Sequence, residues 1–241
     1  MFYFLLAPMV AWHYILIGAA VIPAIFLMRK VYVSDRLEKE DPVFLRQLVL
    51  VGVLSTLVAM VLERIGSGIL GWFLPYESKA YQLILYFLIV GCAEEGCKFF
   101  FLKKCTWNSP HFNCQYDGVV YAVFISLGFA LWENISYVLH YGLSTAFVRA
   151  VTAVPGHACF GVFMGVFYGI ARDAAARGLT EKAKINLIWA VVLPVIMHGA
   201  YDYIASTSTE YDYFFLVFIL ILFTVSYLLV DRSSKADHYI W

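Results

Sequence analysis

Seven long apolar runs divide this chain of 241 residues. A transmembrane helix needs about 20 consecutive, mostly apolar residues. Runs of about that length lie at 3–28, 44–62, 80–102, 118–139, 147–171, 185–206 and 212–230. Charged residues make up 14% of the chain, whereas a soluble domain has about a quarter. The sequence therefore predicts an all-α, polytopic transmembrane helical bundle of about seven spans, forming one integral membrane domain over residues 1–241.

Two of the runs have features that bear on how they cross the membrane. The first run lacks a preceding basic segment and a small-residue cleavage site, so we expect a retained span rather than a signal peptide. The fifth contains Pro155-Gly156. Proline inside a helix breaks or kinks it, whereas proline in the first turn is tolerated. This leaves open a broken or re-entrant helix near 141–156, in which residues 141–154 are interfacial and the true helix starts at Pro155.

The distribution of lysine and arginine predicts the orientation. With the N-terminus outside, 13 of the 17 basic residues fall in cytosolic segments. Three fall outside, namely Arg64, Lys79 and Arg149, and Lys98 lies within the third run. Cytosolic loops of membrane proteins carry such an excess. We therefore expect a multi-pass protein of the cell membrane with an outer N-terminus and a cytosolic C-terminus.

Net charge and cysteine spacing exclude several classes of function. The formal net charge is zero, so no basic field indicates a nucleic-acid partner, and we expect none. The five cysteines form no CxxC pair. Cys105, His111 and Cys114 lie close together, but their spacing matches no standard zinc pattern. The partner that composition indicates is therefore the lipid bilayer.

Two adjacent glutamates, Glu94 and Glu95, interrupt the third run. A carboxylate near the centre of a transmembrane helix costs about 2.5–3.5 kcal/mol, so the pair costs about 5–7 kcal/mol. The apolar residues around them return only about 3–7 kcal/mol. Lys98 lies one turn after Glu94 on the same helical face. Such groups persist when the bundle gives them partners, and they indicate a functional site more often than a polar clamp between helices.

The next three runs also bring polar groups to membrane depth. The fourth run carries Glu133 and Asn134, the fifth His157, and the sixth His198 and Asp202. His198 and Asp202 share a helical face, and a carboxylate beside an imidazole fixes its tautomer and raises its basicity. Taken alone, His157 is equally well explained by a hydrogen bond between helices, and Asp202 by a place near the outer interface. As a set, these residues favour a site.

Four short patterns occur in order along runs three to six. Glu94–Lys98 reads EEGCK, of the form EExxK, and Phe129–Glu133 reads FALWE, of the form FxxxE. His157 stands alone, and His198–Asp202 reads HGAYD, of the form HxxxD. In this order the set resembles the PrsW family of intramembrane proteases, which is related to the superfamily of the CAAX prenyl endopeptidases. The likeness covers about residues 80–206, the expected catalytic core.

The resemblance implies an intramembrane endopeptidase that cuts a single-span, membrane-anchored protein. Family members are similar to site-1 proteases that cut anti-sigma factors in envelope-stress signalling. The implied catalytic residues are Glu94, Glu95, Glu133, His157, His198 and Asp202, with Lys98 and Asn134 in support. Prenyl endopeptidases have a histidine at the position of Glu133 and an asparagine or similar residue at that of Asp202, so a prenylated substrate is not implied. The alternatives are a proton-coupled transporter or channel, because Glu and His chains also relay protons, and a non-catalytic membrane sensor.

The residues leave metal dependence open. A catalytic zinc site has three protein ligands and one position for water. The candidate ligands are His157, His198, Glu95 and Glu133. In the metal-free alternative, a carboxylate of the glutamate pair activates water while His198, held by Asp202, binds the oxyanion. Lys98 favours this alternative because its positive charge would repel a divalent ion. We therefore favour no cofactor and keep zinc as the alternative.

Overall fold

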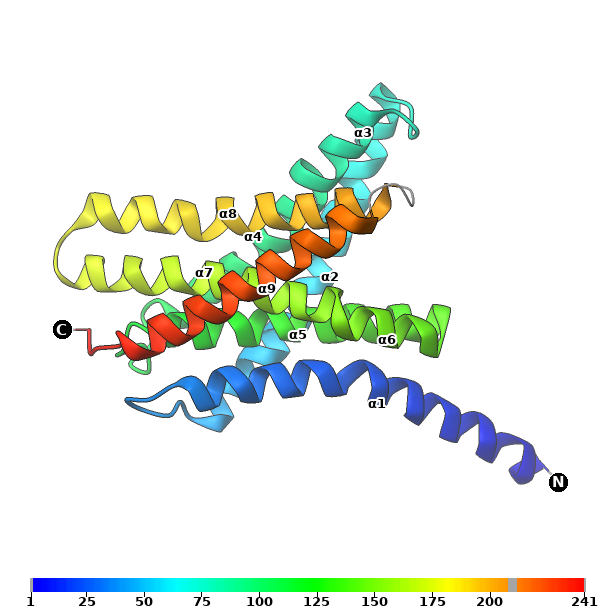
Figure 1. Cartoon of the computed structure of the whole chain (residues 1–241), viewed down its shortest axis with the longest axis horizontal. Coiled ribbons are helices and arrows are strands. Elements are labelled where there is room, and N and C mark those ends of the chain that lie inside the picture. Colours follow the sequence, from blue (N-terminus) through cyan, green and yellow to red (C-terminus); the bar gives the residue numbers. More distant parts are fainter. Residues whose placement is uncertain (1, 208–211, 241) are drawn as a thin grey trace.

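The computed structural model describes residues 2–207 and 212–240, and it is helical nearly throughout (Figure 1). Its elements are α1 (Phe2–Ser34), α2 (Pro42–Phe73), α3 (Lys79–Leu83), the π-helix η1 (Ile84–Val90), α4 (Gly91–Thr106), α5 (Asp117–Tyr141), α6 (Leu143–Val151), α7 (Ala153–Ala176), α8 (Thr180–Ser206) and α9 (Asp212–Lys235). An isolated bridge between Cys114 and Tyr239 is the one β interaction within the described ranges. The all-α prediction is confirmed.

Within the described ranges, six helical segments are long and apolar enough to cross a membrane. They are Val10–Ser34, Pro42–Phe73, Asp117–Tyr141, Leu143–Ala176, Thr180–Ser206 and Tyr213–Lys235. The predicted run 80–102 corresponds to α3, η1 and α4, which follow one another without a loop. It is not among the six because the π-helical turns divide it into pieces of 5, 7 and 16 residues, and the charges of α4 lower its apolar character.

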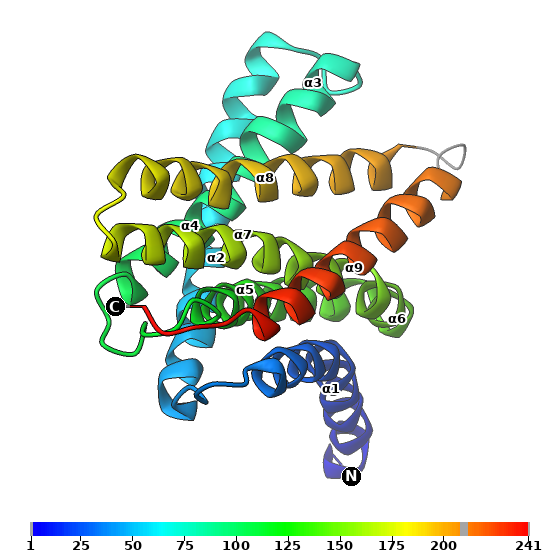
Figure 2. The same ribbon diagram turned by 60° about the vertical axis from the view of Figure 1, so that its left-hand side comes forward.

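Helices α8, α7, α5 and α1 lie in a row, and α2 crosses this row steeply (Figures 1 and 2). Helix α2 has 32 residues and ends eleven residues beyond the predicted end of its span. At 1.5 Å per residue it is about 48 Å long, more than the hydrocarbon thickness of about 30 Å. Its far end and α3 therefore form a hairpin that projects beyond the row, and α9 crosses on the opposite side from α2.

Glycines let the crossing helices approach closely. A Cβ atom added to Gly52 on α2 would lie 2.2 Å from the carbonyl oxygen of Ile125 on α5, and one added to Gly128 would lie 2.3 Å from that of Val49. On the α5–α7 crossing, a Cβ atom at Gly165 would lie 2.5 Å from the carbonyl oxygen of Gly118. Small residues at helix crossings allow this backbone contact inside membranes. Together they make α5 the central helix.

The break in the fifth run lies at Thr152, whose φ and ψ are −122° and −76°. It separates the nine-residue α6 from α7. The sequence left open a break near 141–156 with the true helix starting at Pro155; the structure has the break, but at Thr152. Proline is accepted in the first turn, where the backbone N–H has no helical partner, so α7 begins two residues earlier at Ala153.

Three loops meet at one end of the bundle. Asn113 Nδ2 donates to Glu38 Oε2 at 3.1 Å, which joins the loop before α5 to the loop after α1. The backbone N–H of Ile240 donates to the carbonyl oxygen of Asn113 at 2.7 Å, which joins the C-terminal segment to the same place. The N-terminal end of the chain lies at the far end (Figure 1). The loop after α1, the loop before α5 and the C-terminal segment therefore share one end of the molecule.

Candidate active site

Lys98 is the centre of the buried charge on α4. Its Nζ atom lies 2.7 Å from Glu95 Oε1, 3.2 Å from Glu94 Oε2 and 3.1 Å from His157 Nδ1 on α7. An ammonium group has three N–H donors and no acceptor, so these contacts use all three. Nδ1 of His157 must then be the unprotonated nitrogen. The Phe129 ring covers Nζ at 4.0 Å and shields the group from solvent.

A second set of contacts holds the far side of the His157 ring. Since Nδ1 accepts, Nε2 carries the proton and donates to Glu133 Oε2 at 2.8 Å. The same oxygen lies 3.0 Å from Nη2 of Arg149 on α6. Arg149 Nε donates to Asn134 Oδ1 at 2.8 Å, and the Tyr137 ring lies 4.1 Å from its guanidinium carbon. Such outer partners fix the tautomer and plane of an imidazole.

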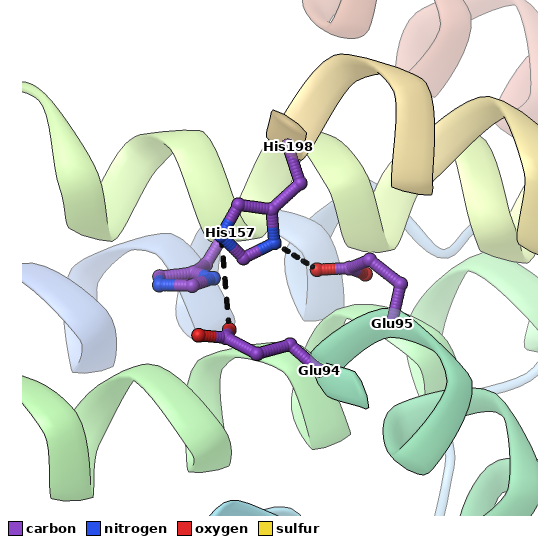
Figure 3. A group of neighbouring side chains, drawn as sticks. All are labelled: Glu94, Glu95, His157 and His198. Carbon is purple, nitrogen blue, oxygen red and sulfur yellow. Dashed lines mark hydrogen bonds and ion pairs between the residues drawn. The ribbon is translucent and has the colours of Figure 1, made fainter. Parts of the chain in front are cut away.

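His198 on α8 faces the two glutamates from the opposite side (Figure 3). Its Nδ1 donates to Glu95 Oε1 at 2.8 Å. Its Nε2 lies 3.8 Å from Glu94 Oε2 and 3.5 Å from Asp202 Oδ2, within ion-pair range of both but too far for strong hydrogen bonds. Phe160 stacks on the imidazole with centroids 5.0 Å apart. The ring is therefore fixed with one nitrogen turned toward Glu94 and Asp202.

A π-helix positions the glutamates. The backbone N–H of Gly91 bonds to the carbonyl oxygen of Tyr86, five residues earlier, at the junction of η1 and α4. Such wide turns are rare, and they occur frequently at functional sites. Helix α8 packs against this segment so closely that a Cβ atom on Gly199 would lie 2.6 Å from the Phe87 ring. Because Gly199 follows His198, this contact brings the histidine to the glutamate helix.

A cavity of about 820 Å³ lies beside these groups. Its wall includes Glu94, Glu133, His157, His198 and Asp202, together with aromatic side chains. Glu95 and Lys98 are fully buried and lie behind the wall. Glu94 is therefore the member of the pair that faces the space where a substrate or water can enter.

The structure brings the six residues predicted to be catalytic, and Lys98, into one connected group. The group is assembled from α4, α5, α7 and α8, which contact one another in the bundle. Asn134, predicted as a supporting residue, points away from this group and toward α1. Its Nδ2 donates to the carbonyl oxygen of Ala20 on α1 at 2.7 Å, and it touches the group only through Arg149.

Two side chains at this site were not selected from the sequence. Arg149 was counted as a basic residue on the outer side, yet it pairs with Glu133. Glu63 on α2 was not considered, yet it lines the cavity together with Thr56 on the same helical face. A signal for Arg149 was available, since a buried carboxylate such as Glu133 needs a cation nearby.

The donor atoms of the group fit a divalent metal ion. Glu94, Glu95, His157 and His198 each offer one oxygen or nitrogen atom, and these atoms lie within 4.8 Å of one another. Zinc prefers such imidazole and carboxylate donors. Oε2 of Glu95 is buried without a hydrogen-bond partner among the described residues, which leaves it available. Glu133, one of the candidates from the sequence, holds the far nitrogen of His157 instead.

Comparison with known proteins identifies the same family as the four sequence patterns do. The family model described as "PrsW family intramembrane metalloprotease" matches residues 40–230. Protease PrsW of Bacillus subtilis (strain 168) is 32% identical over 86% of this chain and 90% of its own length. Protease PrsW of Geobacillus kaustophilus is 33% identical over 86% and 87%, and that of Clostridioides difficile is 28% identical over 90% and 89%. No solved structure matches this chain.

Proposed function

This chain belongs to the PrsW family of intramembrane metalloproteases, and on that premise we propose that it hydrolyses a peptide bond in a single-span membrane protein. The observation that carries the proposal is the cavity whose wall holds Glu94, His157 and His198 together inside a helical bundle. Peptide hydrolysis needs a base for water, an acid for the leaving amine and a donor to the oxyanion. Carboxylates and imidazoles facing one cavity provide groups of these kinds.

We propose an anti-sigma factor as the substrate, cut on the outer side of the membrane as the first step of an envelope-stress response. The resemblance of the four ordered patterns to the PrsW family supports this choice. The position of the cavity supports it as well, because its residues come from the halves of α5, α7 and α8 that lie away from the three joined loops. A cut there separates an outer domain from its membrane anchor.

Each side chain takes a separate role in this proposal. Glu94 faces the cavity and takes a proton from the attacking water. His198 is oriented by Glu95 through Nδ1, which leaves its Nε2 turned toward Glu94 and Asp202. Glu94, once protonated, can pass its proton to the leaving amine. Glu133 holds His157 in the tautomer that leaves Nδ1 as an acceptor.

We propose that the metal of this metalloprotease is zinc, held by Glu95, His157 and His198. Three protein ligands are usual for catalytic zinc, and this choice leaves Glu94 free as the base. When bound, zinc polarises a carbonyl group and acidifies water. Lys98 Nζ contacts donor atoms of Glu95 and His157, so an ion between the same atoms would have to displace the ammonium.

Elemental analysis decides between this proposal and the metal-free alternative. Purified active protein is expected to contain about one zinc per chain, to lose cleavage after chelation and to regain it when zinc is restored. Full activity of zinc-free protein would support the metal-free alternative, in which Lys98 supplies the positive charge.

We propose that the three joined loops are cytosolic and that the N-terminus lies outside. The excess of lysine and arginine at the helix ends beside these loops supports this orientation. Reporter fusions after Gly178 and after the C-terminal residue should both report the cytosol. A translocated reporter at either position would contradict the orientation.

The proposed activity is tested by mixing purified protein, reconstituted with lipid, with a purified single-span anti-sigma factor. Wild type should release the outer fragment, and Glu94→Gln should not. Glu77→Gln makes the same chemical change at an exposed position in the turn between α2 and α3, outside the cavity, and should cut normally. An intact substrate after prolonged incubation with zinc-loaded wild type would contradict the proposed substrate.

A further inference from the structure

Glu63 lies on a helix face that the proposed chemistry does not use. It stands on α2 one and two turns after Met60 and Thr56, and all three line the cavity. Its neighbours in sequence, Leu62 and Ile65, are exposed apolar residues suited to lipid. Glu63 itself is half-buried. The cavity-facing stripe of an otherwise lipid-facing helix therefore carries a carboxylate.

The other charged side chains on the cavity wall have partners. Glu94 pairs with Lys98, Glu133 pairs with Arg149, and Asp202 lies 3.5 Å from His198 Nε2. Among the described residues, Arg149 supplies the one guanidinium on the wall, and it is occupied by Glu133 and Asn134 and covered by Tyr137. Among the described residues, the ammonium of Lys98 is the one nearby, and it is fully buried behind the cavity wall. These cations are therefore not free to pair with Glu63.

Glu63 has no hydrogen bond or ion pair to any residue within 2–207 or 212–240. Another carboxylate, Glu94, lines the same cavity. Its sequence neighbour Arg64 points to a different face of the helix, because adjacent residues are about 100° apart. An ionised carboxylate at membrane depth is costly without a partner, so an unpaired one facing a cavity favours a cation there.

We propose that Glu63 forms a subsite for one basic side chain of the substrate, a lysine or an arginine close to the bond that is cut. This inference rests on the proposed protease function and adds a substrate class to it. The aromatic wall residues Tyr86 and Trp132 suit the long aliphatic stem of such a side chain. The carboxylate of Glu63 then binds the charged end, and the pair removes an unbalanced charge from the cavity.

The test uses single-span substrates that differ at one residue near the cut, which is lysine, glutamine or glutamate. A hydrogen bond to a charged group contributes about 1.5–3 kcal/mol, so wild type should cut the best lysine form with a kcat/KM at least about tenfold above the glutamine form. Glu63→Gln should reduce this ratio to about one. Glu63→Lys should favour the glutamate form instead. The exposed control Glu77→Gln should keep the wild-type ratio.

Two results would overturn the subsite. One is equal wild-type rates for lysine and glutamine forms at each position tested, and the other is a lysine preference that survives Glu63→Gln. Cleavage of the glutamine form by wild type, and its loss in Glu94→Gln, separately tests the protease function. If no form is cut, binding of labelled lysine and glutamine forms to Glu94→Gln protein still measures the subsite, and the same tenfold preference is expected there.

Discussion

Two groups of buried acidic side chains lie at different levels of the molecule, and they differ in how their charge is balanced. In the site, carboxylates of Glu94, Glu95 and Glu133 each contact a lysine, an arginine or an imidazole. At the end where the loops meet, Asp35 and Asp237 lie near other acidic residues. Both carboxylate oxygens of Asp35 and one of Asp237 are buried without a hydrogen-bond partner in the described part of the chain.

The loop-end carboxyl groups bind protons more readily than exposed ones do, because they are buried without paired cations. Burial raises the pKa of Asp35 to about 6, although nearby Lys39 opposes the shift. Burial raises the pKa of Glu40 to about 7, although hydrogen bonds from Tyr121 and Asp117 oppose it. Desolvation of a carboxyl group favours its neutral form unless a positive charge is close. The comparison teaches that the carboxylates of the site are held by paired cations, whereas those at the loop end, which lack such partners, take up protons more readily than exposed carboxyl groups.

The largest expected effect follows from removing the central cation. Lys98→Met leaves Glu94 and Glu95 without their ammonium, and breaking a buried ion pair costs about 3–5 kcal/mol. We expect a strongly lowered Tm in detergent and no cleavage. The matched change at the loop end, Lys39→Met, removes an exposed cation and should cost about 1 kcal/mol or less. Equal losses of Tm would remove the distinction between the two groups.

The next prediction separates the two glutamates. Glu94→Gln should lower kcat by about 10²–10⁴-fold because it removes the proposed base, while Tm changes little. Glu95→Gln should lower kcat and Tm together, because Lys98 and His198 each lose a buried charged partner. Cleavage rates and thermal unfolding of the two variants, measured side by side, test this. The same profile for both variants would mean that the cavity-facing position of Glu94 has no special role.

A smaller effect is expected at Arg149, which acts through Glu133. Arg149→Met should lower kcat by about 10–100-fold, the usual range for losing an outer partner of a functional histidine. Arg149→Lys should recover part of the rate, because it keeps the charge but not the planar fork. Arg64→Met, at an exposed position on α2, serves as the control. Full rescue of Arg149→Met by higher substrate concentration would indicate a role in binding instead.

The smallest effect is expected at the loop end, and it depends on pH. The pKa values of Asp35 and Glu40 are raised in the folded protein, so the folded state binds more protons than the unfolded state between about pH 4 and 7. Stability is therefore lost as pH rises through this window. Asp35→Asn and Glu40→Gln should each add about 1 kcal/mol at pH 8 and little at pH 4. Thermal unfolding at the two pH values measures this, and stabilisation that is equal at both would argue against protonation.

Much of the site was predictable from the sequence because charge is rare in the spans. Glu94, His157 and His198 stand out in apolar runs, and their order along the chain matched a known pattern. Arg149 does not stand out in this way. A basic residue near the end of a span is common, and Arg149 counted only toward the predicted orientation of the chain. Only the short α6 before Thr152 brings its side chain back to Glu133.

Other features depend on contacts between distant segments, which no local pattern records. The expected core of residues 80–206 omits Glu63 of α2 and Phe215 of α9, yet both line the cavity. We therefore expect a fragment limited to 80–206 to leave the cavity without two of its walls. The length of α2 was underestimated because the polar residues Glu63 and Arg64 look like the end of a span, whereas an inclined helix continues past them.

The π-helix before the glutamates has a consequence for sequence comparison. A π-turn accommodates one residue more than an α-turn, so η1 is equivalent to an α-helix that has received a single-residue insertion. Removing one residue between Ile84 and Val90 should restore a regular α-helix. The segment before the deletion would then turn by about 100° relative to α4. Alignments of related chains should therefore show either no gap in this segment or a gap accompanied by changes on the face of α8 that meets it.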